Sequence, residues 1–556
     1  MTSKQKFPVS DVTATSGYFS ALKATVETAF YGNNVQAVTT IAAAYALAKK
    51  APGVIVTDLP VQHASELGLP EDARVLVAND GQVVGRTAAA RRIIGQPGVD
   101  TAELTKIARE AVFAGTRKSF LSGHVVVGLS ADFAVEAHLM VPETYANNLY
   151  TYLLNFQIKT PEATQQYEQS RPLPEDDLYL YADPDWHHPD YPDGLAIFDP
   201  LHNAAIILGL RYFGELKKGT LTLAWATAHR NGFVACHGGM KQYQRQDGTF
   251  TMAAFGLSGS GKSTITLTSH GDRYPVKVLH DDAFVIDRQT GATTALEPAY
   301  FDKTQDYPMS DPNTRYFLTV QNVGVTLDDH GKKTLVTQDI RNGNGRTVKS
   351  RYVTPNRVDH LVESVDAIFW IMKDDALPPV VKVEDPSLAA AFGATLATKR
   401  STAENVRADV DREQLVIEPF ANPFRSYPLG EDYQDFYDLF QQRGMACYIL
   451  NTGFFQGQKV KPSDTLDAIA AIVDGTAAVD GTAAFKPFGP LPAMRYLSLP
   501  NFAVDFSNSA YRALLRQRLD DRLTFLADKA TVADGYDRLP LAATQALEKV
   551  AAALVE

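Results

Sequence analysis

A glycine-rich segment that ends in a lysine constrains this chain more than any other feature. The stretch GLSGSGKST, residues 256–264, has the spacing G-x-x-x-x-G-K-[ST]. In this pattern glycines let backbone amides surround a phosphate, the lysine reaches the outer phosphates, and the hydroxyl binds Mg²⁺. The apolar run 249–255 predicts a strand, and the residues from Thr264 predict a helix whose positive end favours the same anion. A plain glycine-rich turn is the alternative, and the flanking patterns weigh against it.

The length of the chain predicts more than one domain. A chain of 556 residues exceeds what a single hydrophobic core organises. We expect an α/β fold with mixed α and β elements: an N-terminal substrate-side domain at 1–230 and a nucleotide- and metal-binding domain with C-terminal helices at 231–556, with the active site in the cleft between them. Local patterns predict a helix at 34–50, a loop at 176–193 and a strand at 220–227.

Composition excludes several classes of protein. The formal net charge of -11 argues against a nucleic-acid binder and against a binder of anionic membranes, because both need an excess of basic surface. The chain has only two cysteines, so no disulfide framework is implied. It contains no apolar run long enough to span a membrane and no apolar leader. We therefore expect a cytoplasmic protein with small-molecule partners.

Three further groups of residues predict metal and phosphate chemistry. An apolar strand ends at Asp281 and Asp282, 18 residues beyond Ser263, where phosphate-loop enzymes hold the metal. A turn at the end of a strand is the alternative. Upstream, RYFGELKKG (211–219) contains the adjacent Lys217 and Lys218, and ACHGGMK (235–241) contains His237. Taken alone, these would be a solvated lysine pair and a core histidine.

Together these motifs resemble the ATP-dependent phosphoenolpyruvate carboxykinases. RYFGELKKG resembles the family's W-Y-G-G-E-M-K-K-G, FGLSGSGKST its F-G-L-S-G-T-G-K-T-T, and LHDDAF its I-G-D-D-E-H. Further on, SRYVTP resembles T-R-V-S-Y-P and CYILNTGFFQGQK resembles Y-L-V-N-T-G-W. The motifs keep the family's order from about Gly85 to the end of the chain. The GTP-dependent relatives have a cysteine in the phosphate loop, where this chain has Ser260.

The resemblance implies a role for each matching residue. Lys218, His237 and Asp282, with Asp281 beside them, would bind Mn²⁺, and Ser263 would bind the Mg²⁺ of ATP. Lys218, Lys262 and Arg351 would be catalytic, and Arg86, Tyr212 and Arg351 would bind the substrate. The nucleotide would contact a larger set: Lys217, Gly256, Leu257, Ser258, Gly259, Ser260, Gly261, Lys262, Ser263, Thr264, Lys459 and Thr465.

The implied activity is the ATP-dependent conversion of oxaloacetate to phosphoenolpyruvate, ADP and CO₂. The chain departs from the family where Asp-Asp-Glu-His becomes Asp281-Asp282-Ala283-Phe284, and where TAAA follows Gly85-Arg86 in place of Ser-Pro-Lys-Asp. Three alternatives stay open: a kinase on this scaffold with another acceptor, a protein kinase like the HPr kinase/phosphorylases, and a nucleotide-binding regulator without catalysis.

Overall fold

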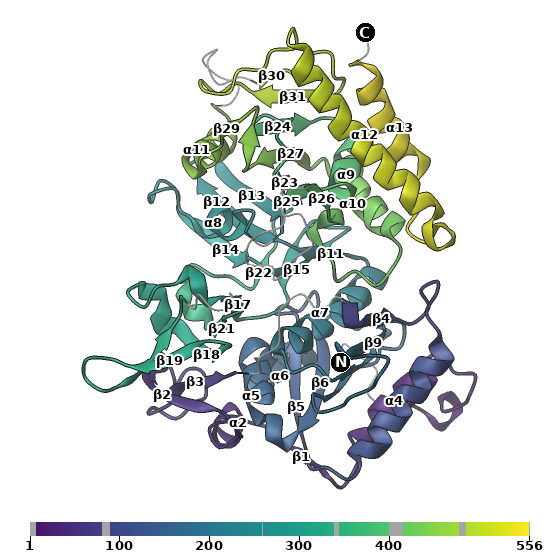
Figure 1. Cartoon of the computed structure of the whole chain (residues 1–556), viewed down its shortest axis with the longest axis vertical. Helices are drawn as coiled ribbons and strands as arrows, with labels where there is room; N and C mark the ends of the chain where they lie inside the picture. Colours follow the sequence, from purple (N-terminus) through teal and green to yellow (C-terminus); the bar gives the residue numbers. More distant parts are fainter. Residues whose placement is uncertain are drawn as a thin grey trace. The chain divides into compact units, whose positions relative to one another are not determined.

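The structure, a computed structural model, describes residues 7–79, 89–257, 259–338, 344–399, 415–476 and 485–554. These residues form two compact units (Figure 1). Unit 1 contains the described residues of Met1–Asn231 and Thr294–Pro355, and unit 2 contains those of Gly232–Thr293, Asn356–Thr402 and Asp409–Glu556. The first segment of unit 1 ends one residue beyond the expected boundary at 230. Unit 1 also takes 294–355, which the sequence analysis assigned to the second domain.

The larger sheet of unit 1 has the strand order β1-β5-β6-β8-β10-β9-β4, with β7 paired to β5. Neighbours β6–β8 and β8–β10 are parallel, whereas β5–β6 and β9–β10 are antiparallel. Strands β8, β9 and β10 are buried along their whole length, as expected when helices cover both faces. The strands are β1 (Val35–Ala37), β4 (Arg91–Ile93), β5 (Phe120–Val127), β6 (Val135–Pro142), β7 (Gln157–Ile158), β8 (Leu178–Asp183), β9 (Leu195–Asp199) and β10 (Ala204–Leu208).

The helices of unit 1 cover both faces of this sheet. They are α1 (Ala21–Ala29), α2 (Ile41–Ala48), α4 (Thr101–Gly115), α5 (Ala146–Asn155), α6 (Pro161–Glu168) and α7 (Phe213–Arg230), with short 3₁₀ helices η1 (Val9–Asp11), η2 (Glu143–Tyr145), η3 (Thr304–Asp306), η4 (Pro312–Tyr316) and η5 (Arg351–Val353). Tyr179 and Ile206 pack with α1 and α4. The next residues along these strands, Leu180 and Ile207, lie against Gly219 of α7. Because successive strand residues point to opposite faces, α7 covers the face opposite to α1 and α4.

A second sheet of unit 1 has the order β17-β21-β18-β3-β2. Its strands are β2 (Ile55–Pro60), β3 (Arg74–Ala78), β17 (Tyr300–Lys303), β18 (Phe317–Gln321) and β21 (Arg346–Lys349). Strand β18 pairs in parallel with β3, and this pairing brings 294–355 into unit 1. The alternating pattern of residues 323–338 predicts a hairpin that turns at 329–331, and the structure confirms it as β19 (Gly324–Leu327) and β20 (Lys333–Val336).

Three local expectations for unit 1 are wrong. Residues 220–227 belong to helix α7, not to a strand. Nearly all side chains of α7 are buried, so the helix has no exposed polar face and its sequence lacks the usual helical periodicity. The alternation of Thr and Leu in its sequence instead matches the pattern of a strand. The range 34–50 contains β1 before α2 begins at Ile41, and the range 176–193 contains the buried strand β8.

The main sheet of unit 2 has the order β14-β12-β13-β23-β27-β24-β31-β30. Its strands are β12 (Gly239–Arg245), β13 (Gly248–Phe255), β14 (Val276–His280), β23 (Ala367–Met372), β24 (Val380–Val383), β27 (Ala446–Asn451), β30 (Phe485–Pro487) and β31 (Met494–Leu497). The neighbours β13, β23 and β27 run parallel at its centre. Their carboxyl ends therefore meet at one edge of the sheet, and the phosphate loop follows β13 at that edge.

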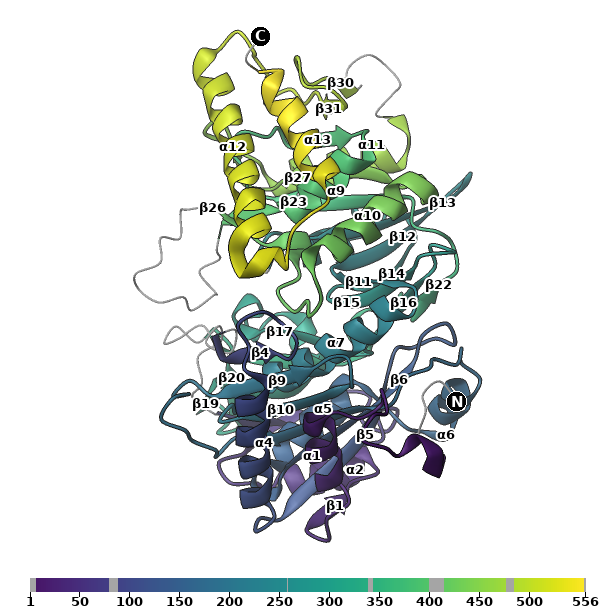
Figure 2. The same cartoon turned by 90° about the vertical axis from the view of Figure 1, so that its right-hand side faces the viewer.

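The helices of unit 2 are α8 (Lys262–Leu267), α9 (Pro386–Ala394), α10 (Leu429–Arg443), α11 (Pro462–Val473), α12 (Ser509–Thr531) and α13 (Leu541–Ala552), with η6 (Pro419–Ala421) and η8 (Val532–Gly535). Ile265 of α8 and Ile469 of α11 share a core with Phe369 on one face of the sheet. On the other face Trp370 contacts α9 and α10. Helices α12 and α13 confirm the expected helical tail and lie side by side (Figures 1 and 2).

Several short strands complete unit 2. Strand β11 (Phe233–His237) pairs antiparallel with β15 (Ala283–Asp287), β25 (Ala397–Lys399) with β26 (Leu415–Ile417), and β28 (Phe454–Phe455) with β29 (Gln458–Lys459). The chain passes from unit 2 to unit 1 within β16 (Thr293–Ala295), and β22 (His360–Leu361) follows the return.

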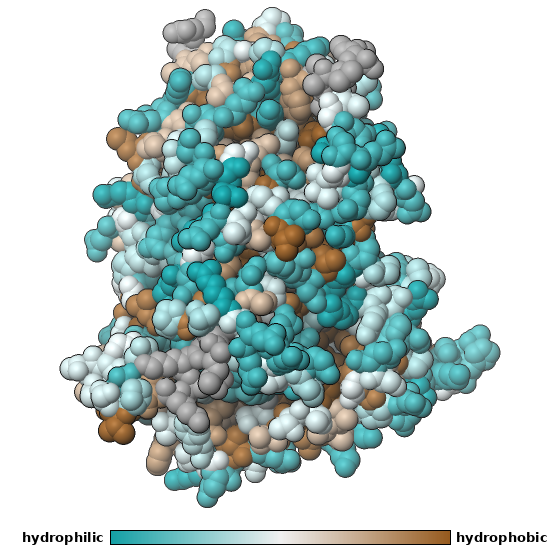
Figure 3. Space-filling model, turned by 180° about the vertical axis from the view of Figure 1, so that it is seen from behind, coloured by the Kyte–Doolittle hydropathy of each residue, from teal (hydrophilic) through white to brown (hydrophobic). Residues whose placement is uncertain are grey.

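Among the described residues, no helix has both the length and the apolar character needed to cross a bilayer. On the face drawn in Figure 3 most of the surface is hydrophilic, and hydrophobic residues gather in small, separate patches. Patches of this kind are ordinary on folded chains.

Candidate active site

The phosphate loop joins β13 to α8, and its glycines have identifiable steric reasons. Gly259 and Gly261 have φ of 82° and 96°, in the left-handed region that other residues adopt at a cost. A Cβ at Gly256 would lie 2.4 Å from the Oγ of Ser260. Helix α8 begins at Lys262, two residues earlier than expected. Ser258 lies outside the described residues.

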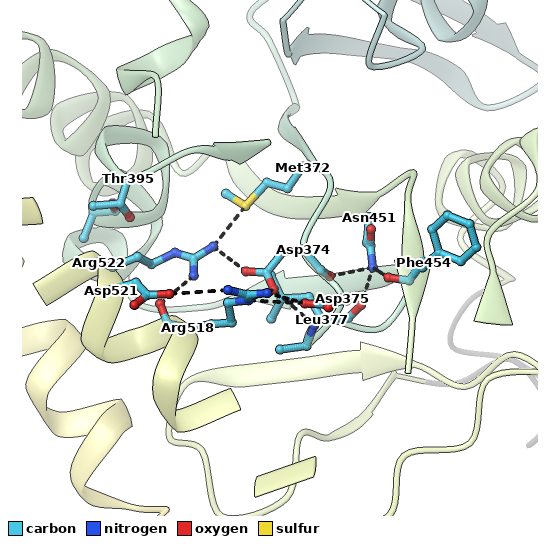
Figure 4. A network of polar contacts seen from close by, with 12 residues as sticks. Met372, Asp374, Asp375, Leu377, Thr395, Asn451, Phe454, Arg518, Asp521 and Arg522 are labelled. Carbon is cyan, nitrogen blue, oxygen red and sulfur yellow. Dashed lines mark hydrogen bonds and ion pairs between the residues drawn. The ribbon is translucent and has the colours of Figure 1, made fainter. Parts of the chain in front are cut away.

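Two neighbouring strand ends hold the loop. The Oγ1 of Thr452 donates to the carbonyl oxygen of Ser260 at 2.8 Å, and its backbone N donates to the carbonyl oxygen of Met372 at 3.0 Å. The side-chain amide of Asn451 donates to the carbonyl oxygens of Asp374, Leu377 and Phe454 (Figure 4). The ends of β23 and β27 are therefore tied to each other and to the phosphate loop.

Helix α12 closes the same network with a buried ion pair (Figure 4). Arg522 is 2% exposed and Asp374 is 0% exposed, and Nη2 of Arg522 lies 2.7 Å from Oδ2 of Asp374. Arg518, one turn earlier in α12, lies 3.0 Å from Asp375. Nη1 of Arg522 donates to the carbonyl oxygen of Arg518. The loop after β23 is thus held by a helix residue that lies 148 residues away in sequence.

The other end of α8 receives a buried lysine. Nζ of Lys241, on β12, donates to the carbonyl oxygens of Ile265 and Thr268 at 2.6 and 2.8 Å. These are groups at the C-terminal end of a helix, where carbonyls have no partner within the helix and the dipole favours a cation. Lys241 is only 1% exposed, and burial lowers its pKa to about 7.

Three predicted residues of unit 2 converge. Nε2 of His237, the last residue of β11, lies 2.9 Å from Oδ1 of Asp282, and Nζ of Lys262 lies 3.9 Å from the same oxygen. Nδ1 of His237 donates to the carbonyl oxygen of Ala421 at 2.5 Å. That carbonyl can only accept, so Nδ1 carries a proton, and Nε2 is the ring nitrogen that faces the carboxylate, where a proton or a cation can lie between the two atoms.

Two residues that the sequence analysis missed position this group. Nδ1 of the fully buried His280 accepts from the backbone N of Asp282 and of Ala283 at 3.0 and 3.1 Å, which fixes the turn between β14 and β15. Ala421 has φ of 54°, a strained value for a residue with a Cβ, and its carbonyl oxygen is the one that His237 contacts. The signal for His280 was its place directly before Asp281; for Ala421 there was none.

Helix α7 of unit 1 contains three of the predicted residues. Tyr212 is its N-cap, and a Cβ at Gly214 would lie 2.3 Å from the Tyr212 ring, so that glycine makes room for it. Nζ of Lys217 lies 2.8 Å from Oε1 of Glu297, and both side chains are completely buried. Lys217 therefore neutralises a protein carboxylate, and its role towards phosphate stays a prediction. Lys218 is half-buried, with Nζ 5.7 Å from the centre of the Trp225 ring.

Arg351 lies at the start of η5 and lines a cavity of about 760 Å³ within unit 1. The neighbouring Tyr352 lines it too and stacks on His63, with ring centres 4.2 Å apart. Lys159 and Ser350 also contribute to the wall. The lining is mainly apolar, with Lys159 and Arg351 as its cations and Glu66 as its carboxylate, and its size suits a small ligand.

The remaining predicted residues are spread over both units. Arg86 lies outside the described residues. Lys459 is exposed on β29, and Thr465 is buried in α11. Lys218 and Arg351 belong to unit 1, whereas His237, Asp282, Ser263 and Thr264 belong to unit 2. The roles of these residues, and the meeting of Lys218 with the other metal ligands, stay predictions.

Two comparisons with known proteins match this chain. A family model described as phosphoenolpyruvate carboxykinase matches residues 66–489. A protein of Aeropyrum pernix named phosphoenolpyruvate carboxykinase (ATP) is 27% identical over 297 residues, which are 51% of this chain and 59% of that protein. The match with this relative thus spans less than two thirds of the relative's length.

Proposed function

Because the chain belongs to the ATP-dependent phosphoenolpyruvate carboxykinase family, we propose that it converts oxaloacetate and ATP to phosphoenolpyruvate, ADP and CO₂. Loss of CO₂ leaves its bonding electron pair in the enolate of pyruvate. The enolate oxygen then attacks the γ-phosphorus, and the bond to the β–γ bridging oxygen breaks to release ADP. The observation that carries this proposal is the family match over 66–489 around a phosphate loop whose Lys262 lies near Asp282 and His237.

The nucleotide side of the reaction falls to unit 2. Lys262 would neutralise charge on the transferring phosphoryl group, Ser263 would bind Mg²⁺, and the backbone of 256–261 with Thr264 would surround the phosphates. Lys459 and Thr465 would contact the ribose and base. The ties from Thr452 and Lys241 support this role, because they hold both ends of the loop-and-helix segment. A fixed donor set needs no reorganisation during phosphoryl transfer.

The residues present fit the Mn²⁺ that the family implies. Nε2 of His237 and Oδ1 of Asp282 are 2.9 Å apart, about the separation of two adjacent ligands bonded at about 2.1 Å each. Two lone pairs at this distance repel each other unless a proton or cation lies between them. Lys218, as a neutral amine, would be the third ligand, with Asp281 beside them. The metal, when bound, would stabilise the negative charge of the enolate and of the phosphoryl group.

Unit 1 would bind the substrate. Arg351 would bridge the γ-phosphate and a substrate carboxylate, Arg86 would hold the carboxylate, and Tyr212 would pack on the substrate. The place of Arg351 and Lys159 on the wall of a cavity of about 760 Å³ supports this assignment. We place the reaction in the cytoplasm, where the two buried thiols Cys236 and Cys447 would stay reduced.

The test is a direct measurement of all three products. With oxaloacetate, ATP, Mg²⁺ and Mn²⁺, we expect phosphoenolpyruvate, ADP and CO₂ in equal amounts, detected by ³¹P NMR and by release of labelled CO₂. Formation of ADP without phosphoenolpyruvate would point instead to a kinase with another acceptor. If neither phosphoenolpyruvate nor ADP is formed, the proposed catalysis is contradicted.

A further inference from the structure

A second cluster of metal-ligating side chains lies on the larger sheet of unit 1. His124 on β5 and Glu136 and His138 on β6 bring one ligand atom each to within 4.8 Å of one another. His124 stands directly opposite His138, and Glu136 stands opposite Val126, two residues along from His124. All three side chains therefore project from the same face of the sheet. The strands are neighbours in Figure 1.

We propose that His124, Glu136 and His138 bind a divalent transition-metal ion such as Zn²⁺. Two imidazoles and one carboxylate form a donor set that suits Zn²⁺ and similar ions better than Mg²⁺ or Ca²⁺. Oε2 of Glu136 lies 2.8 Å from Nε2 of His124, close to the separation of adjacent ligands on one metal. The two imidazole rings stack with centres 4.2 Å apart, so small rotations bring a nitrogen of each to a shared ion.

A second layer of contacts already orients His138. Its Nε2 lies 3.0 Å from Oδ2 of Asp177, which leaves the other ring nitrogen for a metal. A carboxylate on the far nitrogen is the usual partner of a metal-bound histidine. Tyr179 stacks on the opposite side of the same ring, with centres 4.6 Å apart.

Lys159 is the group that opposes a metal here. Its ammonium contacts Oε1 of Glu136 and leaves Oε2 facing His124. A cation next to the carboxylate repels a divalent ion, so Lys159 limits the affinity without blocking the ligand atom. The alternative is a network of ion pairs and stacked rings with no metal. The two cases differ in what removal of Lys159 does.

Aromatic and apolar side chains surround the cluster, and His124 is partly exposed to solvent. Phe30 and Tyr179 lie against the ring of His138, and Val126, which stands opposite Glu136, belongs to an apolar group with Ala134 and Tyr167. Glu136 is 1% exposed, whereas His124 is 37% exposed. An ion can therefore enter past His124 and reach a carboxylate that is shielded from water.

The experiment measures Zn²⁺ binding to the full-length chain by calorimetry and the visible spectrum of bound Co²⁺. A His237→Ala background removes the catalytic metal site proposed above, so that the result is independent of that proposal. We expect a site of 1:1 stoichiometry that His124→Ala or His138→Ala weakens at least 10-fold. Asp177→Asn should weaken it about 10-fold, as outer partners of metal ligands do. His202→Ala is the matched control, because His202 pairs with Asp199 without a third ligand, and it should leave the affinity unchanged.

Lys159→Met provides the test that does not depend on loss of function. If the cluster binds metal, removing the cation should tighten Zn²⁺ binding about 3- to 10-fold. The Co²⁺ spectrum should also respond to His124→Ala, since the ligand set changes. Zn²⁺ affinity that is indifferent to both histidine substitutions, or that falls in Lys159→Met, would overturn the proposal and leave an ion-pair network.

Discussion

At the scale of single residues, the contact between His237 and Asp282 demands an ion or a proton. Nδ1 of His237 donates to the carbonyl oxygen of Ala421, so Nε2 is the nitrogen that faces Oδ1 of Asp282. We predict that His237→Ala and Asp282→Asn each lower Mn²⁺-stimulated turnover at least 10²-fold, because the loss of one electrostatic group from a transition state costs about that much. The measurement is the initial rate against Mn²⁺ concentration.

The matched control is His330→Ala, at the exposed tip of the β19–β20 hairpin. This variant should keep the rate and the Mn²⁺ dependence of the unmodified chain. Full activity with Mg²⁺ alone in both site variants would contradict a metal role for His237 and Asp282. The activity would then need another source of charge stabilisation.

The residue scale also shows how far the sequence reaches. Lys262 and Asp282 lie in short motifs and His237 was indicated by the family resemblance; the structure brings the three side chains together, and their roles stay predictions. Ala421 could not be predicted, because it acts through a backbone carbonyl that every residue possesses. Thr452 acts through an ordinary hydroxyl at a strand end. Contacts of this kind depend on tertiary placement and leave no pattern in the sequence.

At the scale of elements, the C-terminal end of α8 depends on the buried Lys241. Burial lowers its folded-state pKa to about 7, whereas an unfolded lysine titrates near 10.4. Between these values the unfolded chain binds the extra proton, so the free energy of unfolding rises with pH from 7 towards 10.4 and falls as pH falls. For one proton this is about 1.4 kcal/mol per pH unit, or about 2 kcal/mol between pH 7.0 and 8.5.

We predict that Lys241→Met removes this pH dependence. Chemical denaturation at pH 7.0 and 8.5 gives the change in the free energy of unfolding between the two pH values. This change should be smaller in Lys241→Met than in the unmodified chain. Lys277→Met, on the neighbouring strand β14, is the control, because Lys277 is exposed and should behave like the unmodified chain. Equal pH slopes in all three proteins would mean that the lysine is not held in its buried form.

The ion pair between α12 and the loop after β23 makes a second prediction for an element. Asp374→Asn leaves the guanidinium of Arg522 buried without a counter-charge, which should cost about 3–5 kcal/mol of unfolding free energy. Arg518→Ala removes a half-exposed pair with Asp375 and a longer contact of 3.8 Å with Asp374, and it should cost less than Asp374→Asn, about 1 kcal/mol. Denaturation midpoints measure both values.

The double variant Asp374→Asn with Arg522→Met separates a charge effect from simple loss of packing. It removes the unpaired charge and should recover most of the stability lost in Asp374→Asn. A double variant as unstable as the single one would assign the loss to the backbone contacts of this loop. The helical tail itself was predictable from its periodic pattern. The ion pair between Arg522 and Asp374 was not, because nothing in the sequence pairs an arginine with one aspartate among many.

At the scale of the whole molecule, the mixed α/β class could be predicted, whereas the path of the chain could not. The phosphate-loop motif implies a strand and a helix, and a long chain implies several domains. The assignment of 294–355 to unit 1 follows from the pairing of Thr319 with Leu76 and of Gln321 with Ala78. This parallel pairing joins strands over 240 residues apart in sequence. The local periodicity of a strand does not indicate which other strand it pairs with.

The division into two units predicts which strands a bound nucleotide stabilises. The phosphate loop and α8 lie in unit 2, whose core strands β13, β23 and β27 are the ones tied to the loop. A ligand that binds only the folded form of one unit stabilises that unit, by about 2.7 kcal/mol at 100 times its dissociation constant. We therefore expect Mg²⁺–ADP at that concentration to slow amide hydrogen exchange in these strands about 100-fold, measured by mass spectrometry. Strands β5, β6 and β8 of unit 1 should change far less, and Lys262→Ala should remove the protection in unit 2. Equal protection of both sets of strands would show that the units open together, in which case nucleotide binding stabilises the chain as one cooperative body.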